Sequence, residues 1–293
     1  MSFLKQKQRS TTTLVKIPSN GKHQPIDNIT LSELGFVEVM PMNARDEINL
    51  NMPDLLVTGA AIRKLIESCV PSVKDAGVLP YPDAQILLLA IKRASHGKTL
   101  DVEVECPKCS TQMEISYDLD SLVADHNVNQ LPEHEVAIEL DADFYCYIRP
   151  FTLNSFNEQN FEMFTIVQQD RAIKEALETK SITEERAEEI KKQIRENLSI
   201  SAIKRVATTI SRFTYGGEEE TDRKEIEDFV LGCDASYVKK INDAITELMS
   251  SGIRPVAHVC EKCNHEWDHT PEFNPTLFFA QHSQEVASNI KKP

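Results

Sequence analysis

Apolar residues recur at helical spacing in two segments of the first third of the chain. Residues 59–70 predict an amphipathic helix, whose apolar face consists of Ile62, Leu65, Ile66 and Cys69. Residues 83–95 are apolar along most of their length, with Pro82 before them and Gly97 soon after, as is usual at the two ends of a helix. We expect these two helices to pack against each other.

Alternating apolar and polar residues predict strands on both sides of these helices. Residues 35–42 alternate, and a helical segment with acidic residues in its first turn follows at Asn43 until Pro53 interrupts it. Residues 136–140 and 144–150 form another alternating pair. The three residues between them include two aspartates, which predicts a β-hairpin.

The middle of the chain has a helical pattern. Residues 152–179 predict one helix, and Ser181 with Glu184 has capping-box spacing before a second. The apolar stripe of the second helix consists of Ile190, Ile194, Leu198, Ala202, Val206 and Ile210. The glycines after Tyr215 break the pattern, and a last helix has the stripe Val238, Ile241, Ile245 and Leu248. We therefore predict an α-helical insertion over residues 151–254.

Two segments on either side of this insertion repeat one scheme. Residues 102–119 (VEVECPKCSTQMEISYDL) and residues 256–273 (VAHVCEKCNHEWDHTPEF) each contain a strand, a Cys-x-x-Cys turn, polar residues and a second strand. Each segment predicts one half of a zinc ribbon.

The fold class that follows is α+β, with a split zinc ribbon of two Cys-x-x-Cys hairpins and an inserted helical region. Residues 1–30 show no sustained period and predict an extended N-terminal arm, which is either a disordered tail or a segment that orders on a partner. Residues 31–150 form the α+β domain with the first cysteine turn. Residues 255–293 contain the second turn and the C-terminal segment.

The charge and the apolar runs exclude two kinds of partner. A formal charge of −14 repels phosphate backbones, so we expect no nucleic-acid partner. The longest apolar run, residues 86–91, is far shorter than the roughly 20 residues of a spanning helix, so we expect no membrane insertion. The basic residues near the start precede no apolar stretch of the secretory kind, which indicates synthesis in the cytoplasm.

Four of the seven cysteines have the spacing of metal ligands. Structural zinc prefers four tetrahedral ligands, and the two turns supply four thiolates: Cys106, Cys109, Cys260 and Cys263. A loop of 150 residues separates the pairs. Closing such a loop costs about 4 kcal/mol, whereas structural zinc contributes roughly 10 to 16 kcal/mol in small peptides. We therefore predict one structural Zn²⁺ ion and no catalytic residue. Apolar patterns surround the other cysteines, which are expected to be buried: Cys69, Cys146 and Cys233.

Other functions remain open at this point. His265-Glu266-x-x-His269 matches the motif of a zinc-dependent hydrolase, which requires a helix that carries both histidines on one face. Pro271 and the strand-like alternation disfavour that helix. His265 or His269 could instead touch the metal or lie beside it. A regulatory zinc-ribbon protein is the other alternative, and a redox role for either cysteine pair is disfavoured because neither follows a thioredoxin-like pattern.

The order of these segments resembles the baseplate hub protein family of contractile-tailed, T-even-type bacteriophages. The resemblance extends over most of residues 14–120 and 256–280, and the helical middle is much less diagnostic. The matching stretches are residues 17–22, 37–70, 83–97, 102–119 and 263–279.

The resemblance implies a non-enzymatic structural component or assembly factor of the phage tail baseplate, in its hub region. Its expected partners are other tail and baseplate proteins in a multi-subunit assembly, and its expected location is the virion, after assembly in the host cytoplasm. The family's functional residues are the cysteines of its two turns, which correspond to Cys106, Cys109, Cys260 and Cys263.

Overall fold

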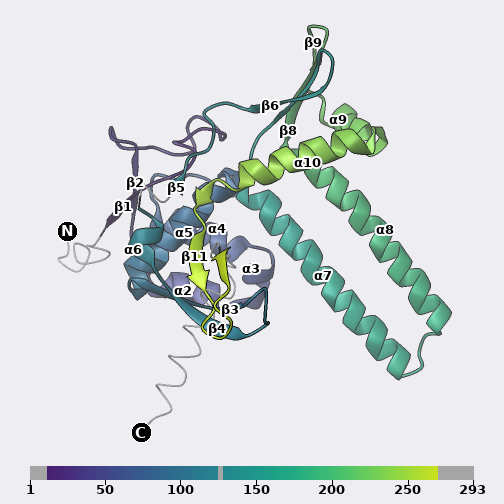
Figure 1. Cartoon of the computed structure of the whole chain (residues 1–293), viewed down its shortest axis with the longest axis horizontal. Helices are drawn as coiled ribbons and strands as arrows, with labels where there is room; N and C mark the ends of the chain where they lie inside the picture. The colour runs from purple at the N-terminus through teal and green to yellow at the C-terminus, as the bar shows by residue number, and fades with distance from the viewer. Residues whose placement is uncertain (1–11, 125–127, 270–293) are drawn as a thin grey trace. The chain divides into compact units, whose positions relative to one another are not determined.

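A computed structural model describes residues 12–124 and 128–269 of the chain. The chain divides into two compact units, called unit 1 and unit 2 below (Figure 1). Unit 1 comprises Met1–Leu56, Ala60–Glu133 and Met249–Pro293, and unit 2 comprises Val57–Gly59 and His134–Leu248. Both cysteine turns therefore belong to unit 1, although the larger part of unit 2, His134–Leu248, separates them in the sequence.

Unit 1 combines short helices with two-stranded antiparallel sheets. Its helices, with α3 ending at the boundary, are α2 (Ala44–Leu50), α3 (Pro53–Val57), α4 (Ala60–Cys69), the 3₁₀ helix η1 (Ala76–Val78), α5 (Tyr81–His96) and α6 (Leu119–Leu122). Its strand pairs are β1 (Thr13–Lys16) with β2 (Phe36–Val39), β3 (Thr99–Glu105) with β4 (Gln112–Asp118), β5 (Val128–Asn129) with β10 (Gly252–Ile253), and β11 (Val256–Val259) with β12 (Glu266–His269).

Helix α5 lies at the centre of unit 1. Ten of its 16 residues are buried, because α4, α6 and strands β1, β2 and β10 pack around it. The two helices predicted at residues 59–70 and 83–95 are confirmed, and α4 does pack against α5. The apolar character of α5 on nearly every side is what a fully surrounded helix requires.

The described part of the N-terminal arm packs on unit 1. Val15 in β1 and Ile17 are buried, and β1 pairs with β2. The backbone N–H of Ser19 donates to Asp83 Oδ1 at 2.8 Å, and the Ser19 hydroxyl donates to the other oxygen of the same carboxylate. Asp83 stands in the first turn of α5, so the arm is attached to the start of the central helix. Residues 1–11 of the predicted arm lie outside the described residues.

Unit 2 contains a four-stranded antiparallel sheet and four helices among its described residues. The strand order is β6 (Val136–Asp141), β7 (Phe144–Ile148), β8 (Ile210–Tyr215) and β9 (Glu218–Glu220). The helices are α7 (Leu153–Glu178), α8 (Glu184–Thr209), α9 (Arg223–Gly232) and α10 (Ala235–Met249). The predicted hairpin of β6 and β7 is confirmed, and so are the three predicted helices, which correspond to α7, α8 and α10.

The β8–β9 hairpin was not predicted, and it shows that the inserted region contains strands as well as helices. Its turn residues Gly216 and Gly217 have φ angles of 58° and 89°, the left-handed pair typical of a tight hairpin. Because β6 pairs with β7 and β7 pairs with β8, unit 2 begins at His134, whereas the predicted insertion begins at residue 151. The insertion is therefore part sheet and not helical throughout.

Helices α7 and α8 run side by side as a long antiparallel pair within unit 2 (Figure 1). Only three of the 26 residues of α7 and four of the 26 residues of α8 are buried. None of the helices in the described residues is long and apolar enough to cross a membrane.

Candidate metal centre

The first cysteine turn lies at the end of the β3–β4 hairpin. The seven residue pairs of this hairpin run from Thr99 opposite Asp118 to Glu105 opposite Gln112. Side chains alternate across it, so that Val104 and Tyr117 are buried while the acidic side chains between them face solvent. This regular ladder holds Cys106 directly at its end.

The second cysteine turn lies at the end of the shorter β11–β12 hairpin. Its four residue pairs run from Val256 opposite His269 to Val259 opposite Glu266. His258, Trp267 and His269 face one side of this hairpin and are half-buried, while the residues between them are exposed. The hairpins predicted around both cysteine pairs are confirmed.

The two turns have the same backbone geometry. In the first, Cys106 N donates to Thr111 O at 3.0 Å, and Ser110 N donates to Cys106 O at 2.9 Å. In the second, the bonds from Cys260 N to His265 O and from Asn264 N to Cys260 O are both 2.9 Å. Ser110 and Asn264, which each follow the second cysteine, have φ angles of 53° and 52°. The repeat seen in the sequence is therefore a structural repeat as well.

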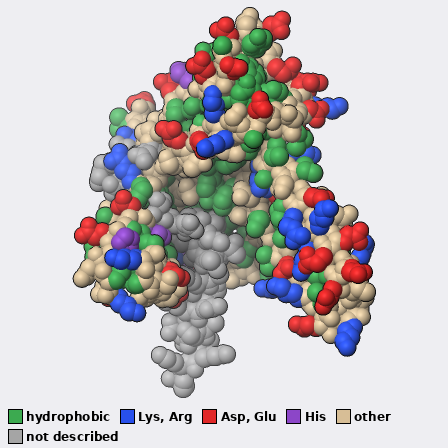
Figure 2. Space-filling view, turned by 45° about the vertical axis from the view of Figure 1, so that its right-hand side comes forward, with side chains coloured by type: hydrophobic (Ala, Val, Ile, Leu, Met, Phe, Trp, Pro, Cys, Tyr) green, Lys and Arg blue, Asp and Glu red, His purple; other side chains and the backbone are tan. Residues whose placement is uncertain are grey.

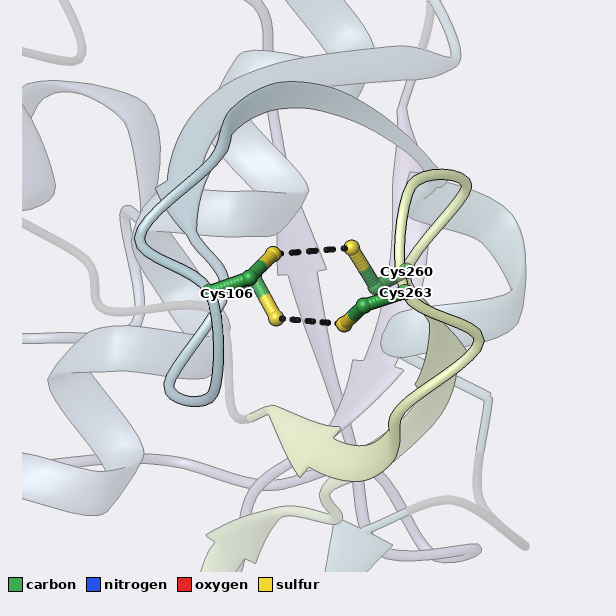
Figure 3. A group of neighbouring side chains, drawn as sticks. Cys106, Cys260 and Cys263 are labelled. Atoms are coloured by element: carbon green, nitrogen blue, oxygen red, sulfur yellow. Dashed lines mark hydrogen bonds between the residues drawn. The ribbon is translucent and has the colours of Figure 1, made fainter.

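The four sulfur atoms of the two turns converge (Figure 3). Cys106 Sγ lies 3.7 Å from Cys263 Sγ, and Cys109 Sγ lies 3.6 Å from Cys260 Sγ. All four sulfurs lie within 4.8 Å of one another, and the first cysteine of each turn is buried while the second is half-buried. The first cysteine of one turn thus faces the second cysteine of the other in both pairs.

These separations fit a metal centre and not disulfides. A disulfide bond is about 2.05 Å long, well below either distance. Four thiolates placed about 2.3 Å from a tetrahedral zinc ion would lie about 3.8 Å apart, close to the two measured separations. Four thiolate donors are also the ligand set that structural zinc prefers. The residues therefore fit Zn²⁺.

Hydrogen bonds within the turns favour the thiolate form of two cysteines. The Thr111 hydroxyl, 3.1 Å from Cys109 Sγ, is the largest cause of the lowering of the Cys109 pKa to about 6. The backbone N–H of Cys263 is the largest cause of the lowering of the Cys260 pKa. Burial raises the pKa of Cys263 to about 12, so a bound cation would have to displace that proton.

A hydrogen-bonded cluster of Tyr117, His258 and His269 joins the strands of the two hairpins. The Tyr117 hydroxyl lies 3.0 Å from His258 Nε2 and 2.6 Å from His269 Nδ1. Burial raises the pKa of Tyr117 to about 12, which keeps this bridging hydroxyl protonated. Sequence reasoning missed this cluster. Nothing in the sequence showed that the faces of the two hairpins that carry these side chains meet.

The hydrolase motif does not form the helical arrangement that its chemistry requires. Glu266 and His269 lie in strand β12 and not on a helix, which removes the geometry that the motif requires. His269 bonds Tyr117, and the His265 ring stacks on Trp267 with centroids 6.2 Å apart. Among the described residues, the group that could hold a metal contains the four cysteines and neither histidine.

The three other cysteines lie away from this group. Cys69 and Cys146 are buried, as predicted, and burial raises the pKa of Cys146 to about 12. Cys233 is only half-buried. None of the three forms a disulfide.

Comparison with known proteins identifies the family. No curated protein and no solved structure matches the chain. A family model described as T4 bacteriophage base plate protein matches residues 10–280, which include both cysteine turns and all of unit 2. Because this match extends over nearly the whole chain, the protein belongs to the T4 bacteriophage base plate protein family.

Proposed function

We propose that this chain is a structural part or assembly factor of the baseplate hub, and that one Zn²⁺ ion on Cys106, Cys109, Cys260 and Cys263 stabilises it. Membership of the baseplate family supports a structural role in the phage tail, together with other tail proteins. The hub location rests on the resemblance of residues 14–120 and 256–280 to the baseplate hub family. No catalytic residue is assigned.

The convergence of the four sulfurs is the observation that supports the zinc ion. Two turns separated by 150 residues bring their thiols within 4.8 Å of one another, in a crossed arrangement that repeats in both pairs. Hydrogen bonds favour the thiolate form of Cys109 and Cys260. Without a bound metal, these two negative charges would lie next to each other with no positive charge to balance them. A divalent cation provides that charge.

Zinc in this position would have a mechanical role. It would hold the β3–β4 hairpin to the β11–β12 hairpin, and so connect the two parts of unit 1 that flank unit 2 in the sequence. The Tyr117 cluster makes the same connection without metal. The start and the end of unit 2 would then be held together by the zinc ion. Unit 2 itself would be available for contacts with neighbouring subunits.

Metal content tests the zinc ion directly. We expect one zinc per purified chain by mass spectrometry of the element, and much less in the Cys106→Ser and Cys260→Ser variants. Cys233→Ser is the matched control, because Cys233 is outside the group, and it should keep its zinc. Full zinc content in both ligand variants would refute the site.

Imaging of particles tests the hub location independently of zinc. A tagged copy of the chain should complement a phage that lacks it, and label should be found at the centre of the baseplate or of its assembly intermediates. Label at the baseplate periphery alone would refute the hub location and leave the family assignment intact.

A further inference from the structure

Unit 2 has an open pocket whose walls are mostly aromatic. The pocket has a volume of about 640 Å³ and lies over strands β7 and β8, beside α9 and the first turn of α10. Its aromatic residues are Phe144, Phe213, Tyr215, Phe229 and Tyr237. Figure 2 shows hydrophobic side chains gathered near the top of the molecule, where β8 and β9 lie, with acidic side chains around them.

Phe144 is the centre of this aromatic pocket. The β7–β8 register places it opposite Tyr215, on the same face of the sheet as Phe213. The Phe144 ring centroid lies 5.5 to 6.1 Å from those of the other four rings, mostly in edge-to-face arrangements. Of the five, only Phe213 is buried, and Tyr215 is 65% exposed. A closed core would bury such rings, so the cluster is a surface feature.

The rim of the pocket is acidic. Asp141, Glu220 and Glu225 line it, and no lysine or arginine does. None of the three carboxylates forms an ion pair with another of the described residues. The Tyr237 hydroxyl donates to Asp141 Oδ2 at 3.4 Å. Aromatic faces carry partial negative charge, so rings and carboxylates together favour a cation.

The opposite face of the same sheet shows which cation suits this combination. There the Arg212 guanidinium lies 3.8 Å from the centroid of the Tyr147 ring. Two carboxylates pair with that guanidinium, those of Glu135 and Glu219. The aromatic pocket offers the same two kinds of group, and its lining supplies no cation of its own.

We propose that the aromatic pocket binds an arginine side chain from a basic segment of a partner protein. A guanidinium can stack on a ring while it donates to carboxylates, which a compact ammonium does less well. A second copy of this chain is a poor occupant, because each copy carries a net charge of −14. This site lies in unit 2, so it rests neither on the zinc ion nor on the hub location.

A titration of the full chain with two matched peptides tests this proposal. One peptide contains two arginines, and the other has citrulline, the uncharged isostere, at both positions. For this experiment the protein is produced with 3-fluorotyrosine in place of tyrosine. The fluorine resonances of Tyr215 and Tyr237 are assigned from their Tyr→Phe variants. We expect saturable shifts of both resonances with the arginine peptide and about tenfold weaker binding of the citrulline peptide.

Rim variants separate a bound guanidinium from a general response. Replacing both Glu220 and Glu225 by glutamine should weaken binding of the arginine peptide about tenfold, because it removes charged acceptors of the guanidinium. Both carboxylates are exposed, so the replacement should leave the fold intact. The matched control replaces Glu184 and Glu185, exposed at the start of α8, and should leave the affinity unchanged. Equal binding of both peptides, no saturable shift, or a shift that depends only on protein concentration would each overturn the proposal. Zinc content should be the same in all of these variants.

Discussion

Helices α5 and α7 represent two different ways of making a helix stable. Helix α5 in unit 1 has ten buried residues out of 16, whereas α7 in unit 2 has three out of 26. The neighbours of α5 surround it, so burial of apolar surface provides most of its stability. Helices α7 and α8 contact each other along a thin seam and leave large apolar side chains such as Phe161, Phe164 and Val167 exposed.

Local interactions compensate for the small buried surface of α7 and α8. The side chains of Thr152 and Thr183 cap the two helices by accepting from the backbone N–H of Ser155 and Arg186. Ion pairs at helical spacing follow along α8, such as Lys191 with Glu188 at 3.0 Å. Each such ion pair is weak on its own, because solvent screens charges at the surface. The comparison shows that unit 1 is a packed domain and that the α7–α8 pair depends on many weak local terms.

The largest expected effect is that loss of the proposed zinc ion destabilises unit 1 and leaves unit 2 unchanged. Cys260→Ser should lower the unfolding free energy of unit 1 by roughly 5 kcal/mol or more, because structural zinc contributes several kcal/mol to folding. Fluorescence of Trp267, the single tryptophan, reports unfolding of the second hairpin. Hydrogen exchange should increase in β3, β4, β11 and β12 and stay unchanged in α7 and α8. An equal increase in both units would contradict the division.

Core truncation compares the two helices directly. Leu88 in α5 is fully buried, so Leu88→Ala should destabilise unit 1 by about 2 to 5 kcal/mol. Val167 in α7 is 46% exposed, so Val167→Ala should change the unfolding free energy by less than about 0.5 kcal/mol. Urea unfolding measures both. Similar losses for the two variants would show that the α7–α8 pair has a core of its own.

The attachment of the arm to α5 predicts a dependence on pH. Burial raises the pKa of Asp83 to about 7, against the lowering effect of its hydrogen bonds from Ser19. The native carboxyl then keeps a proton that the unfolded chain has already lost. Its contribution to the unfolding free energy of unit 1 is therefore complete below about pH 4 and is lost as the pH rises to about 7, by at most about 1.4 kcal/mol per pH unit.

Asp83→Asn should remove this slope, because an amide does not titrate. Asp27→Asn is the control, since Asp27 is exposed on the same unit, and it should keep the slope. Thermal unfolding between pH 4.5 and 8 checks both variants. This range extends from near the pKa of Asp83 in the unfolded chain to above its pKa in the native protein. Parallel curves for the unaltered protein and Asp83→Asn would show that Asp83 is not the titrating group.

The smallest expected effect concerns the cap of α8. Thr183→Ala removes the side-chain bond to Arg186 N and should destabilise the start of α8 by about 1 kcal/mol. Ser199→Ala, on an exposed part of the same helix, should have almost no effect. Hydrogen exchange of the first turn of α8 provides the measurement. Faster hydrogen exchange in α5 as well would contradict the view that the cap stabilises α8 only locally.

The sequence predicted features that depend on local pattern. The cysteine turns, the β6–β7 hairpin and helices α4, α5, α7 and α8 each follow from spacing, capping residues or alternation within one short segment. Prediction failed at β8, because Ile210 continues the apolar stripe of α8 although the helix ends at Thr209. The two glycines after Tyr215 were a hairpin signal and were interpreted only as a break.

Features that join distant segments were less accessible. The cysteine spacing indicated that two turns share one site, since the chemistry of zinc demands four ligands. No such rule connects Tyr117 to His258 and His269, or Ser19 to Asp83, because each contact depends on how separate elements pack. The aromatic pocket likewise arises from a register of β7 against β8 that no single segment encodes.

X-ray absorption at the zinc edge of the purified full chain tests the central claim most directly. The account predicts one zinc per chain with four sulfur neighbours at about 2.3 Å and no nitrogen or oxygen ligand. Absence of zinc from the purified chain, or a first shell in which histidine nitrogen replaces sulfur, would contradict it.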